Sequence, residues 1–240
     1  NCYVLVSDGE TLIIDTGFNR PECKQALFDG LDELQVDFTH TKLFLTHLHG
    51  DHSGLTEELT ARGVPVFMNA IDYDYLCQEL ASGGWQAMEQ IFLSEGFPME
   101  EIEKQKKGNQ ARLYSPHHPF PASKVSDNDL LTVGGITLRC IHTPGHTPGH
   151  TCLYIEDKEI LFSGDHILFD ITPNISVWRN IPYSLADYLE SLQKIKGLKV
   201  SHTKETAENR YRALCHSSDL FFYSRRFSDD DFCEHVTHYA

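Results

Sequence analysis

Residues 46–54, with the sequence THLHGDHSG, contain four side chains that can bind a metal ion or move a proton. His47 and His49 stand two residues apart, directly after the apolar run TKLFL, and Asp51 and His52 follow. Residues two apart in an extended strand point to the same side, so His47 and His49 can face one ion, and Asp51 and His52 a second point nearby. A polar loop with a helix-capping aspartate would explain one such pair. Four potential ligands in six residues favour a metal site instead.

Two later motifs carry the same residue types. The segment IHTPGHTPGH contains His142, His146 and His150, and its two Thr-Pro-Gly turns hold the loop rigidly. The run LFSGDHIL is an apolar strand that ends just before Asp165. An aspartate after a glycine at a strand end is as often a turn residue as a ligand. Beside two histidine clusters it becomes a candidate bridge between two ions.

These motifs need a sheet to bring them together. NCYVLV and TLIID, joined through Asp-Gly, predict a hairpin over residues 1–15, and TKLFL, VPVFM, TCLYIED and EILFSGD predict further strands. Apolar spacing predicts helices over about 21–34, 55–63 and 184–196, and residues 70–110 predict an inserted helical cap. Strands and helices alternate, so we expect one α/β domain with sheet inside and helices outside. The last helix is expected to carry one apolar face: Leu185, Tyr188, Leu189, Leu192 and Ile195.

Composition limits the function classes. The 240 residues carry a formal charge of −15, which would repel nucleic-acid phosphates, and no stretch approaches the ~20 apolar residues that span a bilayer. Seven cysteines without CxxC spacing and no signal-peptide pattern predict a protein of the reducing cytoplasm. The sequence begins at Asn1 in a strand-like run and leaves an upstream segment open. We expect a small-molecule substrate and neither a nucleic-acid partner nor a membrane, while the sequence predicts no oligomeric state.

Asp15-Thr16-Gly17, THLHGDH, HTPGHTPGH and SGDHI, in this order and spacing, resemble the metallo-β-lactamase superfamily over residues 1–200. Within it, the chain is most similar to the branch of glyoxalase II-like thioesterases and uncharacterised metallo-hydrolases. The resemblance implies a four-layer αββα sandwich with the metal site at one edge of its two sheets. It also implies a ligand set: His47, His49 and His146 for one ion, Asp51 and His52 for a second, and Asp165 between them, with His142 and His150 in supporting places.

The resemblance further implies a metal-dependent hydrolase of a small ester, thioester or lactone. Two divalent ions would lower the pKa of a shared water from ~15.7 toward neutrality and supply a metal-bound hydroxide, with Asp51 orienting that water and carrying its proton. These ligands predict two zinc ions, and iron or manganese would fit the same atoms. A cysteine at the position of Asp165 marks one group of true β-lactamases, and its absence here disfavours an antibiotic substrate.

The chain departs from the family pattern near its end. The family supplies one more histidine for the second ion, in a Gly-His turn after the helix at 184–196 and a following strand. Here the nearest histidine is His202, a few residues early, and it is our candidate for the remaining ligand. Residues 201–240 form either a divergent end of the same domain or a tail. Two alternative functions stay open: a mononuclear iron dioxygenase or redox protein that uses the three histidines of the first ion, and a metal-binding protein without catalysis.

Overall fold

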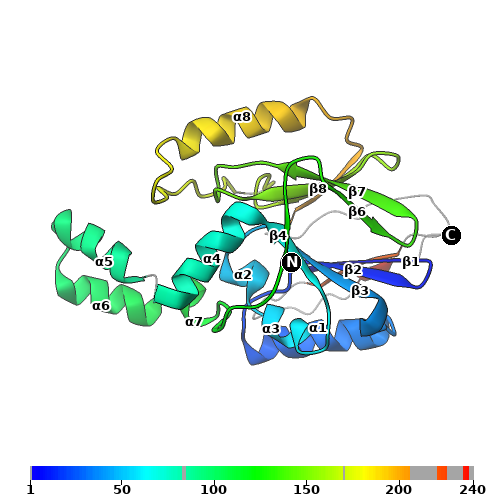
Figure 1. Ribbon diagram of the computed structural model, residues 1–240, viewed down its shortest axis with the longest axis horizontal. Helices are drawn as coiled ribbons and strands as arrows, with labels where there is room; N and C mark the ends of the chain where they lie inside the picture. Colours follow the sequence, from blue (N-terminus) through cyan, green and yellow to red (C-terminus); the bar gives the residue numbers. More distant parts are fainter. Residues whose placement is uncertain (1, 83–84, 170, 206–220, 226–234, 238–240) are drawn as a thin grey trace.

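The computed structural model describes residues 2–82, 85–169, 171–205, 221–225 and 235–237. Two β-sheets pack face to face, and helices cover both outer faces, as Figure 1 shows. The predicted four-layer αββα sandwich is thereby confirmed.

The first sheet has seven strands in the described part of the chain, in the order β12-β11-β1-β2-β3-β4-β5. β1 and β2 form the predicted hairpin, and Asp8 and Gly9 between them both have positive φ, 45° and 76°, as a tight Asp-Gly turn requires. β2 to β5 pair in parallel, so their carboxyl ends meet at one edge of the sheet. The strands are β1 Cys2–Ser7, β2 Glu10–Ile14, β3 Thr41–Leu45, β4 Val66–Asn69, β5 Ser123–Val125, β11 Phe221–Arg225 and β12 His235–Thr237.

The second sheet has five described strands, in the order β10-β9-β8-β7-β6. β6 to β9 pair antiparallel, and β10 runs parallel to β9. The loop from β7 to β8 and the end of β9 therefore lie at the same edge of this sheet. The strands are β6 Leu130–Val133, β7 Ile136–His142, β8 Thr151–Ile155, β9 Ile160–Gly164 and β10 His202–Glu205.

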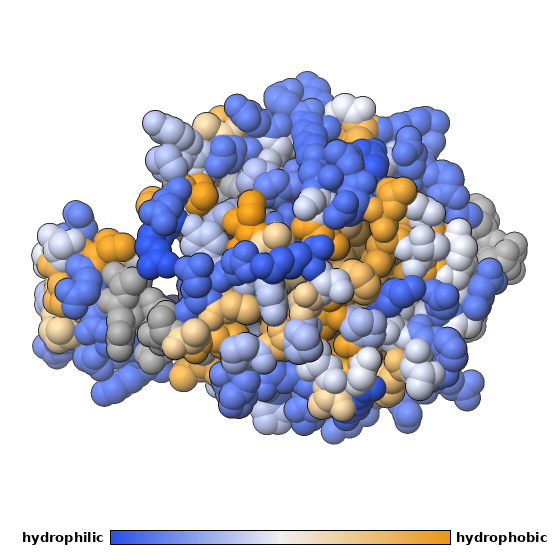
Figure 2. Space-filling view, in the orientation of Figure 1, coloured by the Kyte–Doolittle hydropathy of each residue, from blue (hydrophilic) through white to orange (hydrophobic). Residues whose placement is uncertain are grey.

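Helices form the two outer layers and a projection from one end. In Figure 1, α1 and α3 lie along the first sheet and α8 along the second, while α5 and α6 extend away from the body. Figure 2 shows apolar surface at this projecting end, where Ile91, Phe97 and Met99 are exposed. The helices are α1 Pro21–Glu33, α2 Gly50–Ser53, α3 Thr56–Thr60, α4 Ala70–Ser82, α5 Trp85–Ser94, α6 Met99–Gly108, α7 Gln110–Leu113 and α8 Ser184–Lys196, and a short 3₁₀ helix spans Phe38–His40.

Residues along β2 alternate between two cores. Leu12 and Ile14 pack between the sheets, in one cluster with Phe162 of β9, whereas Ile13 packs on the outer side with Leu31 of α1. Full burial of such a side chain contributes about 1.5–3 kcal/mol relative to exposure. A slip of one residue would exchange the two faces, so burial on both sides fixes the register that carries the site.

α8 spans the predicted residues but turns a different face to its sheet. Ser191 and Ile195 are buried, whereas Leu185 and Leu189 are 61% and 54% exposed, so the predicted apolar face is wrong for these two leucines. The reason is a close approach, because Ser191 Oγ donates a hydrogen bond to the carbonyl of Pro144 at 2.9 Å. A small serine at this contact lets the helix lie directly against the loop that follows β7.

The described cysteines are unpaired thiols, as their spacing predicts. Burial raises the pKa of Cys2, Cys140 and Cys152 to about 12, so these thiols behave as small apolar core groups. Among the helices that the structure describes, none combines the length and the hydrophobicity needed to cross a bilayer.

Candidate metal centre

Three histidine nitrogens converge beyond the end of β3. His47 is fully buried after the strand, and His49 is the N-cap of α2. Nε2 of His47 lies 3.1 Å from Nδ1 of His49, which lies 3.0 Å from Nε2 of His146. All three atoms lie within 4.8 Å of one another. A tetrahedral ion with bonds of about 2.1 Å holds its ligand nitrogens about 3.4 Å apart, so the three atoms fit one ion.

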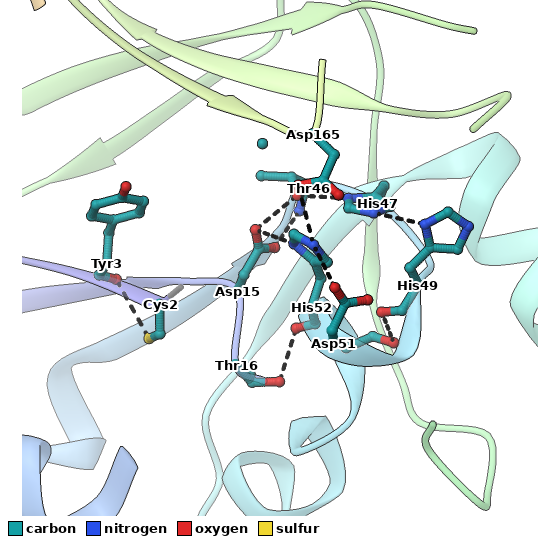
Figure 3. A network of polar contacts seen from close by, with 12 residues as sticks. Cys2, Tyr3, Asp15, Thr16, Thr46, His47, His49, Asp51, His52 and Asp165 are labelled. Carbon is teal, nitrogen blue, oxygen red and sulfur yellow. Dashed lines mark hydrogen bonds and ion pairs between the residues drawn. The ribbon is translucent and has the colours of Figure 1, made fainter. Parts of the chain in front are cut away.

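Asp165 faces a second group of potential ligands as well as the first. Its Oδ2 lies 3.6 Å from Nε2 of His146, and its Oδ1 lies 3.4 Å from Nε2 of His52. The same nitrogen of His52 is 3.4 Å from Oδ2 of Asp51. Asp165 follows β9 of one sheet, whereas His52 and Asp51 follow β3 of the other, as Figure 3 shows. The candidate centre therefore lies where the edges of the two sheets meet.

Asp15, at the end of β2, orients two of these histidines. Its carboxylate accepts hydrogen bonds from the backbone N–H and the hydroxyl of Thr46, both at 2.8 Å, and from Nδ1 of His52 at 2.9 Å (Figure 3). Because Thr46 gives its hydroxyl proton to Asp15, its oxygen accepts from Nδ1 of His47 at 3.0 Å. Both rings thus turn Nε2 toward the candidate metal positions, and partners of this kind fix the orientation of metal-binding histidines.

The loop between β7 and β8 supplies one candidate ligand and one support. Nδ1 of His146 donates to the carbonyl of Asn174 at 2.7 Å, which leaves Nε2 for the site. His150 is fully buried, and its Nε2 accepts the backbone N–H of Asp165 at 3.2 Å. Gly164 has a φ of 51°, and a Cβ there would lie 2.6 Å from that nitrogen. His150 therefore supports Asp165, while His142 donates to the carbonyl of Pro148 at 2.9 Å.

The imidazoles and carboxylates shift one another's pKa values. Burial, with repulsion from neighbouring histidines, lowers the pKa of His47 well below its usual range and that of His49 to about 4. Burial opposes charge on His52 too, but nearby carboxylates, Asp165 first, outweigh it and raise the pKa of His52 well above its usual value. Burial also raises the pKa of Asp51, but His52 outweighs it and brings that pKa to about 2. At neutral pH, His47 and His49 are neutral and Asp51 is ionised, which are the forms that bind metal.

One buried carboxylate near the site is missing from the sequence prediction. Asp72, in the first turn of α4, accepts hydrogen bonds from the backbone N–H of Leu48 at 3.1 Å, the hydroxyl of Thr147 at 2.6 Å and the backbone N–H of Gly149 at 2.5 Å. It joins the two histidine-bearing loops. Burial raises its pKa to about 7, against the effect of these hydrogen bonds. Its one signal in the sequence is its place just after β4, whose carboxyl end lies at the same edge as that of β3.

The structure does not bring His202 to the other six candidates. His202 pairs with Ile160 at the start of β9, whereas Asp165 follows the end of that strand. With a rise of about 3.3 Å per residue, the four residues from Ile160 to Gly164 separate His202 from that end by roughly 13 Å. The β10 residue that pairs with Gly164 is Glu205. His202 therefore lies at the start of β10, and the end of β10 is the part of the strand that lies beside Asp165.

The sequence and the fold of the chain match a known family. A family model described as the metallo-beta-lactamase superfamily matches residues 1–201. The chain belongs to this superfamily. The resemblance drawn from its motifs is thereby confirmed.

Several superfamily relatives are similar to the chain over most of its length. A solved metallo-beta-lactamase family protein from Thermus thermophilus is 30% identical, with a TM-score of 0.75, over 85% of this chain and 67% of that one. Proteins named atrochrysone carboxyl ACP thioesterase, from Emericella nidulans and Aspergillus fumigatus, are 27% and 28% identical over 81% and 82% of this chain. The match covers 47% of each of these two, so the chain spans about half the length of these curated relatives.

Proposed function

We propose that this superfamily member is a metal-dependent hydrolase of a small thioester, ester or lactone and holds two ions. The observation that carries the proposal is Asp165, whose two oxygens face different imidazoles, Oδ2 toward His146 and Oδ1 toward His52. A carboxylate placed between two groups of ligand atoms suits a pair of adjacent ions. The proposed ligands are His47, His49 and His146 for the first ion, Asp51 and His52 for the second, and Asp165 for both.

The donor set fits divalent transition metals. Imidazole nitrogens with carboxylate oxygens suit zinc, and iron or manganese would accept the same atoms. When bound, such ions would lower the pKa of a water and polarise a substrate carbonyl.

Asp51 has a separate role beside the second position. Its pKa of about 2 keeps its carboxylate ionised, so it would accept a hydrogen bond from a water at the second position and orient that water. So low a pKa makes Asp51 a weak base, because an efficient general base titrates near the working pH. We therefore assign it orientation of the water ahead of proton removal.

Thioesters are the favoured substrates of the three. Two fungal relatives are named as ACP thioesterases. In addition, the segment between Asp165 and α8 exposes several apolar side chains, and this segment contacts His146 through Asn174. Apolar surface on a segment that contacts a candidate ligand suits an acyl group. These side chains are Phe169, Ile171 and Val177.

The test measures metal and turnover on the same preparation. Metal content per chain is determined by mass spectrometry. Hydrolysis of acyl-coenzyme A and acyl-N-acetylcysteamine thioesters is followed by thiol release. A p-nitrophenyl ester series and a lactone with an acyl side chain are assayed in parallel. We expect zinc, thioester hydrolysis that a chelator abolishes and zinc restores, and inactivity of His47→Ala. Protein that binds two ions and cleaves none of these substrates would contradict the proposal. One iron per chain with oxygen consumption on persulfide would favour the dioxygenase instead.

A further inference from the structure

Trp178 contacts two of the three histidines at the first metal position. It lies in the segment between Asp165 and α8, and its ring stacks on that of His49, with centroids 6.1 Å apart and planes 29° apart. Its Nε1–H donates a hydrogen bond to the backbone carbonyl of His146 at 3.2 Å. One half-buried side chain thus touches ligands that come from two different sheets.

The helical insertion holds Trp178 in turn. The ring of Tyr75, on α4, meets the indole edge to face, with centroids 5.8 Å apart and planes 75° apart. The hydroxyl of Tyr75 donates to the carbonyl of Arg179, the residue after Trp178. The Arg179 guanidinium donates to Oε1 of Gln78 on the same helix at 2.9 Å. The position of the indole is therefore set by α4 on one side and by the histidines on the other.

A free imidazole rotates about its side-chain bonds, and an ion binds it only in one orientation. His146 is already fixed at its ring by the carbonyl of Asn174, so Trp178 adds a restraint on its backbone. For His49 the part of the chain that the structure describes shows ring contacts with His47, His146 and Trp178. The first two are candidate ligands themselves. Trp178 is thus the one described ring contact of His49 that comes from outside the candidate ligand set, and it limits how the ring of His49 can rotate.

We propose that Trp178 is a positioning residue for the first metal ion and that α4 sets its position through Tyr75. This inference rests on the metal site of the proposed function and adds that the helical insertion controls the affinity of one ion. Partners that orient metal ligands typically change affinity by roughly 10–100-fold when they are removed. The expected effect is a loss of that size at the first position, with the second position unchanged.

The affinity test compares four variants with the intact chain by competition of cobalt or zinc against a chromophoric chelator. Trp178→Ala is expected to weaken the first ion roughly 10–100-fold. Trp178→Phe keeps an aromatic face and loses the N–H, so its affinity for the first ion falls less. Tyr75→Phe is expected to lower the affinity for the same ion slightly. Phe97→Ala, which truncates an exposed aromatic side chain at the projecting end, is the matched control and leaves both affinities unchanged. Folded Trp178→Ala with the affinities of the intact chain would overturn the inference.

A second readout keeps Trp178 in place and does not depend on catalysis. The sequence has two tryptophans, so Trp85→Phe leaves Trp178 as the single emitter. Binding of one equivalent of paramagnetic cobalt is expected to quench most of its emission, and zinc is expected not to. Cobalt bound without quenching, or no metal bound by the intact chain, would overturn the inference.

These results separate the inference from the proposed function. If quenching and the loss of affinity are observed but no substrate is hydrolysed, the positioning role of Trp178 is supported and the hydrolase function is overturned. If a thioester is cleaved, the kcat of Trp178→Ala should recover at saturating zinc, because the residue acts through the ion. A raised KM that excess zinc does not correct would instead make Trp178 a substrate contact and overturn its assignment as a positioning residue.

Discussion

Oδ2 of Asp15 lies 2.9 Å from Nδ1 of His52, and both side chains are buried. Asp15 reaches this contact with a φ of 61°, a left-handed conformation that aspartate and asparagine adopt more readily than most residues. Because the contact occupies Nδ1 of His52, the other nitrogen of the ring faces Asp51 and Asp165. One buried carboxylate therefore determines which atom of His52 faces the proposed second metal position.

Asp15→Asn is expected to weaken binding of the second ion by roughly 10–100-fold and that of the first ion less, because Asp15 contacts His52 directly and His47 only through Thr46. The amide tolerates the same backbone conformation but lacks the charge that holds His52. Chelator competition with metal analysis gives both affinities. Asp8→Asn, at an exposed turn aspartate that also has positive φ, is the control and should behave as the intact chain. Equal affinities in Asp15→Asn and the control would show that this contact does not orient His52.

Asp165→Ala is expected to lower metal content and turnover together, because it removes the carboxylate that faces both groups of ligands. Metal analysis and thioester hydrolysis on one preparation measure the two effects. Asp157→Ala, in the exposed turn between β8 and β9, is the control with neither effect. Full activity in folded Asp165→Ala would remove the two-ion hydrolase.

Titration with a chelator is expected to release the two ions in separate phases. The first position offers three histidines, whereas the second offers Asp51, His52 and a shared Asp165 among the described residues. The raised pKa of His52 also means that a proton must leave before an ion binds there. The earlier phase should abolish most hydrolysis. A single cooperative phase would mean that a further ligand completes the second position.

Asp72 gives the metal-free protein a pH-dependent stability. Its pKa is about 7 in the folded chain against 3.8 for an ordinary aspartate. Between these values the folded state binds more protons than the unfolded one, so the free energy of unfolding falls as the pH rises toward 7. The slope from this group is at most about 1.4 kcal/mol per pH unit.

Urea unfolding in chelator from pH 4 to pH 8 tests this slope by difference. Asp72→Asn cannot ionise, so the stability of the intact chain minus that of the variant should decline up to about pH 7 and then level off. Ile71→Val, at an exposed side chain of the same helix that carries no titrating group, should show a flat difference. A flat difference for Asp72→Asn as well would show that Asp72 is ionised throughout.

The sequence predicts the parts of the centre that depend on local geometry. The end of β3 presents His47 and His49, rigid turns present His146, and the end of β9 presents Asp165, so their convergence follows once the two sheets pack. The orienting contacts of Asp15 and Asp72 join residues 24 to 77 positions apart, and these depend on how whole elements meet. Asp15 stood out as part of a motif, whereas Asp72 lies in a helical run with no mark of its own.

Two other features depend on packing that periodicity does not encode. The apolar stripe of α8 predicts a buried face with Leu185 and Leu189, but the close contact of Ser191 with Pro144 rotates the helix away from it. The distance of His202 from Asp165 follows from the register of β10 against β9, which a residue count along the chain does not give.

The segment between Asp165 and α8 touches the histidine loops through the carbonyl of Asn174 and the indole of Trp178. These two contacts mark the parts of the segment that a redesign must keep. Residues on either side of them can be exchanged for those of a relative to transplant selectivity, provided that the carbonyl and the indole are kept in place. Laboratory evolution of selectivity for new substrates would then begin from libraries in this segment, while the residues of the candidate metal centre are left unchanged.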